Sequence, residues 1–302
     1  MDAGVSTIVA TVPVPKREGG SLWSDAWRRL KRNRMAVLSG WTLVAIGVIT
    51  LLAPWIPGLP DPNGADFALG VTPPSLAHPF GTDLLGRDML ARTIYGGRIS
   101  ILVGLVGTLV SLVIGVTYGA VSAYAGGKVD EFLMRVVDVL YSLPYIFLVI
   151  LLLTVFAKSL LLLFIALGAV QWLTMARIVR GQVLSLKNQN FVEAARALGA
   201  NDGRIVFGHI VPNTLGPVIV YTTLTIPAII LQEAFLSFLG LGVQPPDASW
   251  GVLVSEGAQM LAFFPWLTIF PGAALALTLF AFNFLGDGLR DALDPQDRRV
   301  AG

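Results

Sequence analysis

The sequence predicts an all-α membrane protein with six transmembrane helices, and three observations support this fold class. Charged residues make up only 13% of the 302 residues, whereas hydrophobic residues make up 55%; soluble domains average about 25% charged residues. Six apolar windows are close to the roughly 20 residues that a helix needs to cross a bilayer. Lys and Arg are distributed unevenly between the segments that join these windows. The windows are 36–56, 99–125, 136–157, 159–176, 217–239 and 260–286.

The distribution of basic residues predicts that both termini lie in the cytoplasm. With that orientation, 17 of the 21 Lys and Arg residues fall in cytoplasmic segments. The four others, which lie outside, are Arg87, Arg92, Arg98 and Lys158. Cytoplasmic loops carry the excess of positive charge in membrane proteins. The chain has no Cys and two His, so it offers no thiol chemistry, and we expect no metal centre.

The N-terminal part divides into three elements. Residues 1–20 are predicted to be a disordered cytoplasmic tail. Residues 21–35 are predicted to form an amphipathic helix at the membrane interface, since one helical face gathers Leu22, Trp23, Ala26, Trp27 and Leu30. The alternative is a basic anchor that only fixes the orientation. The first transmembrane helix is predicted at 36–57; its length and late start distinguish it from a signal peptide.

The segment 58–98 is predicted to be an extracytoplasmic loop. Its charged residues Asp83, Arg87, Asp88 and Arg92 are close enough in sequence to form an ion-pair network at the outer mouth. Two interpretations remain open at this point. The network stiffens the entrance, or it belongs to a docking or gating surface for a solute-binding protein.

Residues 99–290 are predicted to form a core with the other five transmembrane helices. A four-residue series of small side chains in the second window indicates close helix packing; it comprises Gly107, Ser111, Gly115, Gly119, Ala123 and Gly127. Glu233 lies near the outer end of the fifth window, where it is either part of the pathway or a gate, or makes a hydrogen-bonded contact between helices. Asp138 is expected to pair with Arg135 three residues before it.

One cytoplasmic loop, 190–213, reads NFVEAARALGANDGRIVFGHIVPN and predicts two short helices. Asn190 and Glu193 have the spacing of a capping box for a helix over 191–198. Gly199 is placed where the chain needs a positive φ. A second helix is expected from Asp202 to about Val211, ending before a break at Pro212. Helices this short are unstable alone, so the loop is expected to dock on a cytoplasmic protein.

This loop resembles the EAA motif of permease subunits of ABC importers. The shared pattern is Glu193-Ala194-Ala195, three residues, Gly199, and nine residues before His209-Ile210-Val211-Pro212. His209 and Val211 depart from the usual Ile and Leu. In that family the loop is the coupling helix that inserts into the ATPase subunit. The resemblance therefore implies a coupling role for Phe191, Glu193, Ala194, Ala195, Leu198, Gly199 and Asp202.

Three further segments narrow the resemblance to the C-type permease subunit of oligopeptide and dipeptide importers. They are HPFGTDLLGRDMLARTIYGGRIS (78–100), FLSFLGLGVQPPDASWG (235–251) and GDGLRDALDPQDRR (286–299). The resemblance runs from about residue 21 to 299 and implies the type I (MetI-like) importer permease fold. It places the chain in the bacterial cytoplasmic (inner) membrane as a multi-pass protein, with a cytoplasmic tail at 291–302.

The resemblance also implies the partners of the chain. They are a homologous B-type permease, two ABC ATPase subunits (D- and F-type), an extracytoplasmic peptide-binding protein and membrane lipid, with no nucleic acid. The chain lacks a phosphate-binding loop, because Gly126-Gly127-Lys128 has no glycine at the required earlier position. We therefore expect no catalysis and no cofactor in this chain, with ATP and Mg²⁺ bound by the ATPases. The alternatives are nickel or glutathione as the substrate, or a secondary transporter.

Overall fold

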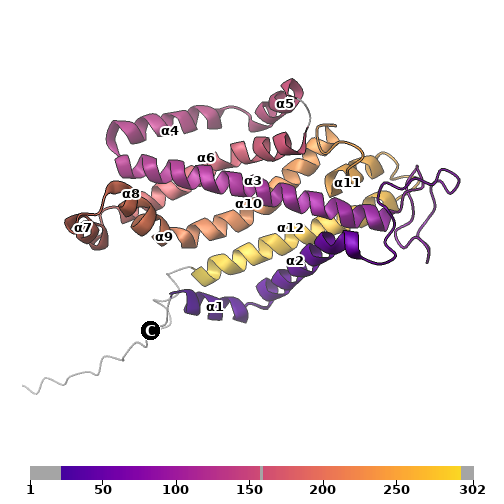
Figure 1. Ribbon diagram of the computed structural model, residues 1–302, viewed down its shortest axis with the longest axis horizontal. Helices are drawn as coiled ribbons and strands as arrows, with labels where there is room; N and C mark the ends of the chain where they lie inside the picture. The colour runs from indigo at the N-terminus through magenta and orange to yellow at the C-terminus, as the bar shows by residue number, and fades with distance from the viewer. Residues whose placement is uncertain (1–21, 157–158, 294–302) are drawn as a thin grey trace, which may run out of the picture.

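The computed structural model describes residues 22–156 and 159–293, and these residues form a bundle of helices (Figure 1). The predicted tail 1–20 and all but the first residues of the tail 291–302 lie outside the described residues. Within the described part, five helical segments are long and apolar enough to cross a membrane, and a bent pair of helices forms a sixth when taken as one span. The five are α2 (Arg34–Leu52, continued by the short turn η1, Ala53–Trp55), α3 (Met89–Ala125), α6 (Leu160–Leu186), α10 (Leu215–Phe238) and α12 (Trp266–Leu293).

Helix α3 lies at the centre and is longer than its apolar window. Its 37 residues correspond to about 55 Å at roughly 1.5 Å per residue, well beyond a hydrocarbon core of about 30 Å. The sequence predicted its start near residue 99, but the helix begins ten residues earlier, where the Asp88 carboxylate accepts a hydrogen bond from Ala91 N at 2.8 Å. A cap sets this helix start, and hydropathy carries no signal for it.

The small-residue face of α3 packs closely against another helix, as the sequence predicted, and the structure identifies this partner as α6. A Cβ added at Gly115 would lie 2.5 Å from the Met175 side chain, and one at Gly119 would lie within 3.0 Å of the Ala176 backbone. Glycine is required here because the two backbones approach closely. Gly127 is the exception in the predicted series, since it lies beyond the end of α3 and begins α4.

The predicted third span, 136–157, is wrong as a single straight helix. The chain forms α4 (Gly127–Ser142) and α5 (Tyr145–Val155), which are bent by 81°. Pro144 has no N–H and forces the preceding Leu143 into an extended conformation (φ −76°, ψ 137°). Asp138 on α4 pairs with Arg177 of α6 at 2.8 Å and not with Arg135, so that predicted pair is also wrong.

The first helix, α1 (Leu22–Arg32), falls where the sequence predicted an interfacial helix, and it packs beside the last part of α12 (Figure 1). Ala26 is buried, whereas Trp27 is exposed with the Lys31 ammonium 5.1 Å from its ring. Asn33 separates α1 from α2 and caps α2 by accepting from Ala36 N at 3.2 Å. The position of α1 at a membrane surface stays a prediction.

One buried helix, α11 (Trp250–Ala258), was not predicted. Ser249 caps it by accepting from Val252 N at 3.1 Å. Trp250 is 2% exposed, and its indole N–H donates to Thr93 O of α3 at 2.8 Å. Helix α11 packs against α3, α10 and α12, so the segment that joins the last two spans is folded into the bundle.

Candidate functional site

The candidate coupling loop projects beyond one end of the long helices (Figure 1). Its first helix is α7 (Asn190–Ala197), which starts only four residues after α6 ends. The predicted capping box is wrong, because the residue before the helix is Gln189 and no side chain caps it. Asn190 is instead the first residue of the helix.

The exit from α7 agrees with the sequence prediction. Gly199 has φ +80°. Its N–H donates to Arg196 O at 3.0 Å, and Ala200 N donates to Ala195 O at 3.1 Å. Together these two bonds form a Schellman motif, which satisfies the last carbonyls of the helix. A Cβ at Gly199 would meet no atom within 4 Å, so it is the backbone conformation that requires glycine.

Helix α7 is docked by one face onto its own chain. Val192 and Ala195 are buried in a cluster that includes Val183 of α6 and Ile205. Ala195, one of the residues given a coupling role, therefore has its side chain packed inward, and its coupling role stays a prediction. Phe191, at 38%, and Leu198, which directly follows the helix, at 89%, are exposed. Glu193 and Ala194 are exposed as well.

The second helix begins where it was predicted but does not end at Pro212. Asn201 caps α8 (Asp202–Arg204) by accepting from Arg204 N at 2.8 Å. The helix then widens into a π-helical turn, η2 (Ile205–Ile210), and continues as α9 (Val211–Asn213), which contains the proline. Only Thr214 separates α9 from α10. The loop therefore joins the next span almost as one helix.

Tyr124 at the end of α3 links the two short helices. Its hydroxyl donates to Asp202 Oδ1 at 2.7 Å and accepts from Arg196 Nη2 at 3.4 Å. The second contact raises the pKa of the Arg196 guanidinium, which keeps it charged. Asp202 thus contacts α3, which the sequence did not indicate.

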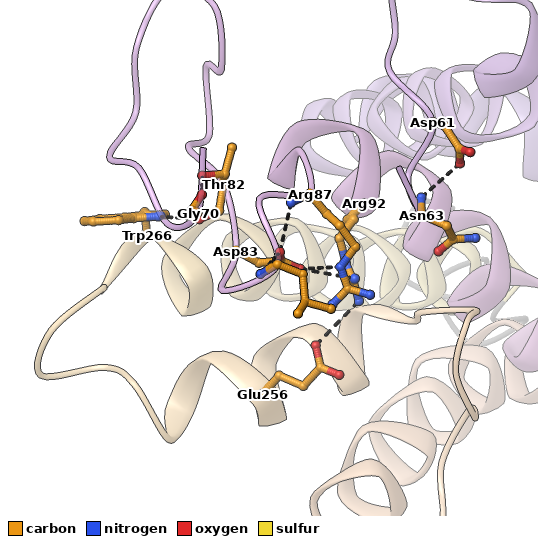
Figure 2. Close-up of polar contacts among 10 residues, drawn as sticks. Asp61, Asn63, Gly70, Thr82, Asp83, Arg87, Arg92, Glu256 and Trp266 are labelled. Atoms are coloured by element: carbon orange, nitrogen blue, oxygen red, sulfur yellow. Dashed lines mark hydrogen bonds and ion pairs between the residues drawn. The ribbon is translucent and has the colours of Figure 1, made fainter. Parts of the chain in front are cut away.

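The loop before α3 lies at the end of the bundle away from the coupling loop (Figure 1), and Figure 2 shows its charged cluster. Asp83 is its centre: Oδ2 accepts from Arg87 Nε at 2.6 Å and from Arg92 Nη1 at 3.2 Å. Arg92, which is 2% exposed, also reaches Glu256 of α11 at 3.5 Å. The network therefore fastens the loop before α3 to both α3 and α11. Glu256 was not expected as a member.

Asp88 lies outside this network. One of its oxygens caps α3, and the other is 2.8 Å from His78 Nδ1. Trp266 of α12 donates from its indole N–H to Thr82 O at 3.4 Å (Figure 2), which holds the same loop from another side. Among residues 22–156 and 159–293, no group of three His, Asp or Glu side chains could hold a metal ion.

Glu233 of α10 is fully buried and faces the segment that leads into α11. Its Oε1 accepts from Ser249 Oγ at 2.6 Å and from Ser237 Oγ at 2.8 Å. A Cβ at Gly251 would lie 3.1 Å from Oε2. These contacts favour the second of the two sequence interpretations, a hydrogen-bonded contact between helices.

A further polar cluster near the coupling loop was missed by the sequence analysis. Asp130 of α4 forms a two-bond ion pair with Arg180 of α6 and accepts a third hydrogen bond from Ser122. Fifty residues separate the paired groups, so no helical spacing relates them. An acid in the first turn of α4, three residues after Gly127, was the available signal.

Two family models match the chain. A model described as "Binding-protein-dependent transport system inner membrane component" matches residues 83–299. A second, described as "N-terminal TM domain of oligopeptide transport permease C", matches residues 21–74. The first match contains both the coupling loop and the outer cluster.

Curated relatives resemble the chain over nearly its whole length. The oligopeptide transport system permease protein OppC of Haemophilus influenzae is 53% identical over 93% of this chain and 91% of its own. The dipeptide transport system permease protein DppC of Bacillus subtilis is 46% identical over 94% of this chain and 89% of its own. A solved structure titled as an inward-facing conformation of the MetNI methionine ABC transporter contains a chain of similar fold. It has a TM-score of 0.55 at 18% identity and covers 68% of this chain and 98% of that one.

Proposed function

The chain belongs to the family of binding-protein-dependent transport system inner membrane components, and from this premise we propose that it imports oligopeptides or dipeptides as the C-type permease subunit of an ATP-driven transporter. It is a multi-pass protein of the inner membrane. ATP is hydrolysed on separate ATPase subunits, and an extracytoplasmic binding protein delivers the peptide. A B-type permease forms the other half of the pathway, and D- and F-type subunits supply the two ATPases.

The exposure of one side of helix α7 is the observation that carries this proposal. It is anchored by Val192 and Ala195, while Glu193, Ala194 and Leu198 are left exposed at the end of the bundle. The exposed apolar side chain of Leu198 and the exposed carboxylate of Glu193 favour contact with a protein groove that has a basic group. In the proposed complex this groove belongs to the ATPase. Nucleotide-driven motion of the ATPase then moves α7. Because α7 starts four residues after the end of α6, α6 moves with it.

Glu193→Lys tests the coupling role. The tagged chain is purified from bacterial membranes in mild detergent, and the proteins that accompany it are quantified by mass spectrometry. We expect the wild-type chain to bring the second permease and the ATPases. Charge reversal opposite a basic group should lower the ATPase recovery by at least about tenfold, while the second permease remains.

Glu131→Lys is the matched control, because Glu131 is an exposed acid (74%) on α4 with only a 4.0 Å contact to Arg135. It should retain the ATPases. Full ATPase recovery with Glu193→Lys, or equal loss with both variants, contradicts the coupling role of Glu193.

The substrate is tested with the assembled transporter in vesicles, supplied with its binding protein and ATP. Labelled dipeptides and oligopeptides should accumulate only with ATP. Glutathione and nickel are the competitors to include, since they are the alternative substrates. Uptake of either in preference to peptides would replace the peptide assignment and leave the permease role intact.

A further inference from the structure

The ion pair between Asp130 and Arg180 joins three helices beside the coupling loop. Arg180 Nε donates to Asp130 Oδ1 at 2.7 Å, and Nη2 donates to Oδ2 at 2.6 Å. Ser122 Oγ of α3 donates to the same Oδ1 at 2.6 Å. Two parallel bonds from a guanidinium to a carboxylate fix both distance and orientation. Asp130 is buried, which strengthens these bonds further.

Helix α4 has few other polar contacts with the bundle: Tyr118 of α3 donates to Leu133 O at 2.9 Å, and the Arg177 guanidinium of α6 lies 4.3 Å from the Tyr141 ring. Of its residues, only Asp130 and Val137 are buried, and side chains such as Phe132 and Val139 are exposed (68% and 57%). An open cavity of about 510 Å³ separates α4 from α6. It is lined mainly by charged side chains: Asp130, Glu131, Arg135, Asp138, Arg177 and Arg180. Because side-chain packing between α4 and α6 is sparse, the position of α4 depends strongly on its polar contacts.

The second ion pair between these helices is weaker. Arg177 and Asp138 are 2.8 Å apart, but their side chains are 40% and 58% exposed. Exposed pairs contribute about 0–1 kcal/mol. In the Asp130–Arg180 pair the side chains are 12% and 35% exposed and two hydrogen bonds join them, so it is the stronger of the two ion pairs between α4 and α6.

Arg180 lies close to the coupling loop along the same helix. Six residues separate it from the end of α6 at Leu186, and α7 follows at Asn190. In the short connection, Lys187 Nζ donates to Ala123 O of α3 at 3.0 Å. A displacement of α7 is thus passed to α6. Arg180, which binds Asp130 of α4, lies less than two helical turns from the end of α6.

We propose that Asp130 and Arg180 are positioning residues of the transport cycle: their ion pair makes α4 follow the part of α6 that carries the coupling loop. This inference rests on the proposed function, in which α7 receives motion from an ATPase. Helix α4 leads through the 81° bend at Pro144 into α5, so motion at the coupling end reaches the outer half of the membrane through this pair. Without it, the ATPases still bind α7, but α4 and α5 no longer move with each ATP.

The test uses the complete transporter in vesicles and measures peptide accumulated per ATP hydrolysed. Arg180→Gln should lower this ratio by about tenfold, as expected for the loss of a charge-assisted pair, while the ATPase subunits stay bound. The exchange of charges, Asp130→Arg with Arg180→Asp, should restore most of the ratio, because the pair is rebuilt in reverse. Asp138→Asn is the matched control between the same two helices and should leave the ratio unchanged.

Several results would overturn the inference. One is an unchanged ratio with Arg180→Gln; another is a parallel loss of uptake and ATP hydrolysis, which is the mark of a merely structural pair. If Arg180→Gln fails to assemble, Ser122→Ala removes one of the three hydrogen bonds to Asp130 and should still lower the ratio; a normal ratio in that variant also counts against the inference. Failure of the proposed function looks different, because the wild-type transporter itself would then take up no peptide.

Discussion

Gly199 is the residue on which the exit from α7 depends. Its φ of +80° lies in the left-handed region, where a residue with a side chain pays about 1–2 kcal/mol. Gly199→Ala should therefore destabilise α7 by this amount without any steric clash, since the new Cβ meets no atom within 4 Å. Amide hydrogen exchange across 190–200 in the purified chain should become about five- to thirtyfold faster.

Gly216→Ala is the control for this prediction. Gly216 is also free of neighbours within 4 Å, but it lies in α10 without a positive φ. Alanine there should leave exchange in 190–200 unchanged. Equal protection of these amides in wild type and Gly199→Ala would show that the Schellman motif does not hold the end of the helix.

Individual residues also show where sequence reasoning works and where it stops. Gly199 could be predicted, because the need for a positive φ follows from local sequence alone. The partner of Asp130 could not, since it is 50 residues away on another helix. Ala195 was given a coupling role by resemblance, but its side chain joins Val192 in a buried cluster. Which face is buried depends on the neighbouring elements, and a motif does not contain that information.

At the scale of helices, hydropathy located the spans but not their ends. It predicts how much chain can lie in hydrocarbon, and each of its six windows overlaps one of the long helices or the bent pair. It missed the extension at the start of α3, which Asp88 caps. The bend at Pro144 is indicated by the proline and not by hydropathy. Hydropathy also missed α11, because nine residues are too few for a span and its burial arises from contacts with three other helices.

Ser249 gives a prediction at this scale, because it holds α11 in two ways. Its hydroxyl accepts from Val252 N as the helix cap and donates to Glu233 Oε1. Ser249→Ala should destabilise the chain by about 1–3 kcal/mol, since it removes a cap and leaves a buried carboxylate with one hydrogen bond fewer. Thermal unfolding of the purified complex measures this loss.

The corresponding control is Ser185→Ala on α6. Ser185 is exposed and bonds only to Gln182 O of its own helix, at 2.7 Å. Its replacement should change the unfolding temperature little. If Ser249→Ala unfolds at the same temperature as this control, Glu233 and α11 are held together by packing rather than by the serine.

At the scale of the whole molecule, α3 connects the two candidate sites. It begins at Met89, beside the Asp83 and Arg92 network, and it ends at Ala125, next to Tyr124 and its bond to Asp202. The outer loop and the coupling loop are therefore attached to opposite ends of one helix of about 55 Å. In the proposed transporter, α3 is therefore the helix that connects the loop at the entrance with the loop that contacts the ATPase.

The sequence left two roles open for the outer loop, and the exposed fractions of its side chains distinguish between them. The side chains of Asp83, Arg87 and Arg92 are only 11%, 17% and 3% exposed, which suits a network that stiffens the loop. Leu84, which lies between Asp83 and Arg87 in the sequence, is 51% exposed. If a binding protein docks on this loop, it contacts the leucine, and the ion pairs only hold the leucine in place.

Leu84→Asp and Arg87→Ala should therefore have different effects on the assembled transporter. Leu84→Asp should weaken binding-protein affinity by about tenfold or more, because it puts a charge into an apolar contact, and it should leave thermal stability unchanged. Arg87→Ala removes a charged hydrogen bond to Asp83 and should cost about 1.5–3 kcal/mol of stability, with a smaller loss of affinity. Titration of the binding protein against the complex in nanodiscs measures the first quantity, and thermal unfolding measures the second.

Leu76→Asp is the control, because Leu76 is a fully exposed residue of the same loop. It shows whether added negative charge alone repels the binding protein. If it weakens affinity as much as Leu84→Asp does, docking at Leu84 is wrong and stiffening of the entrance remains the role of this loop.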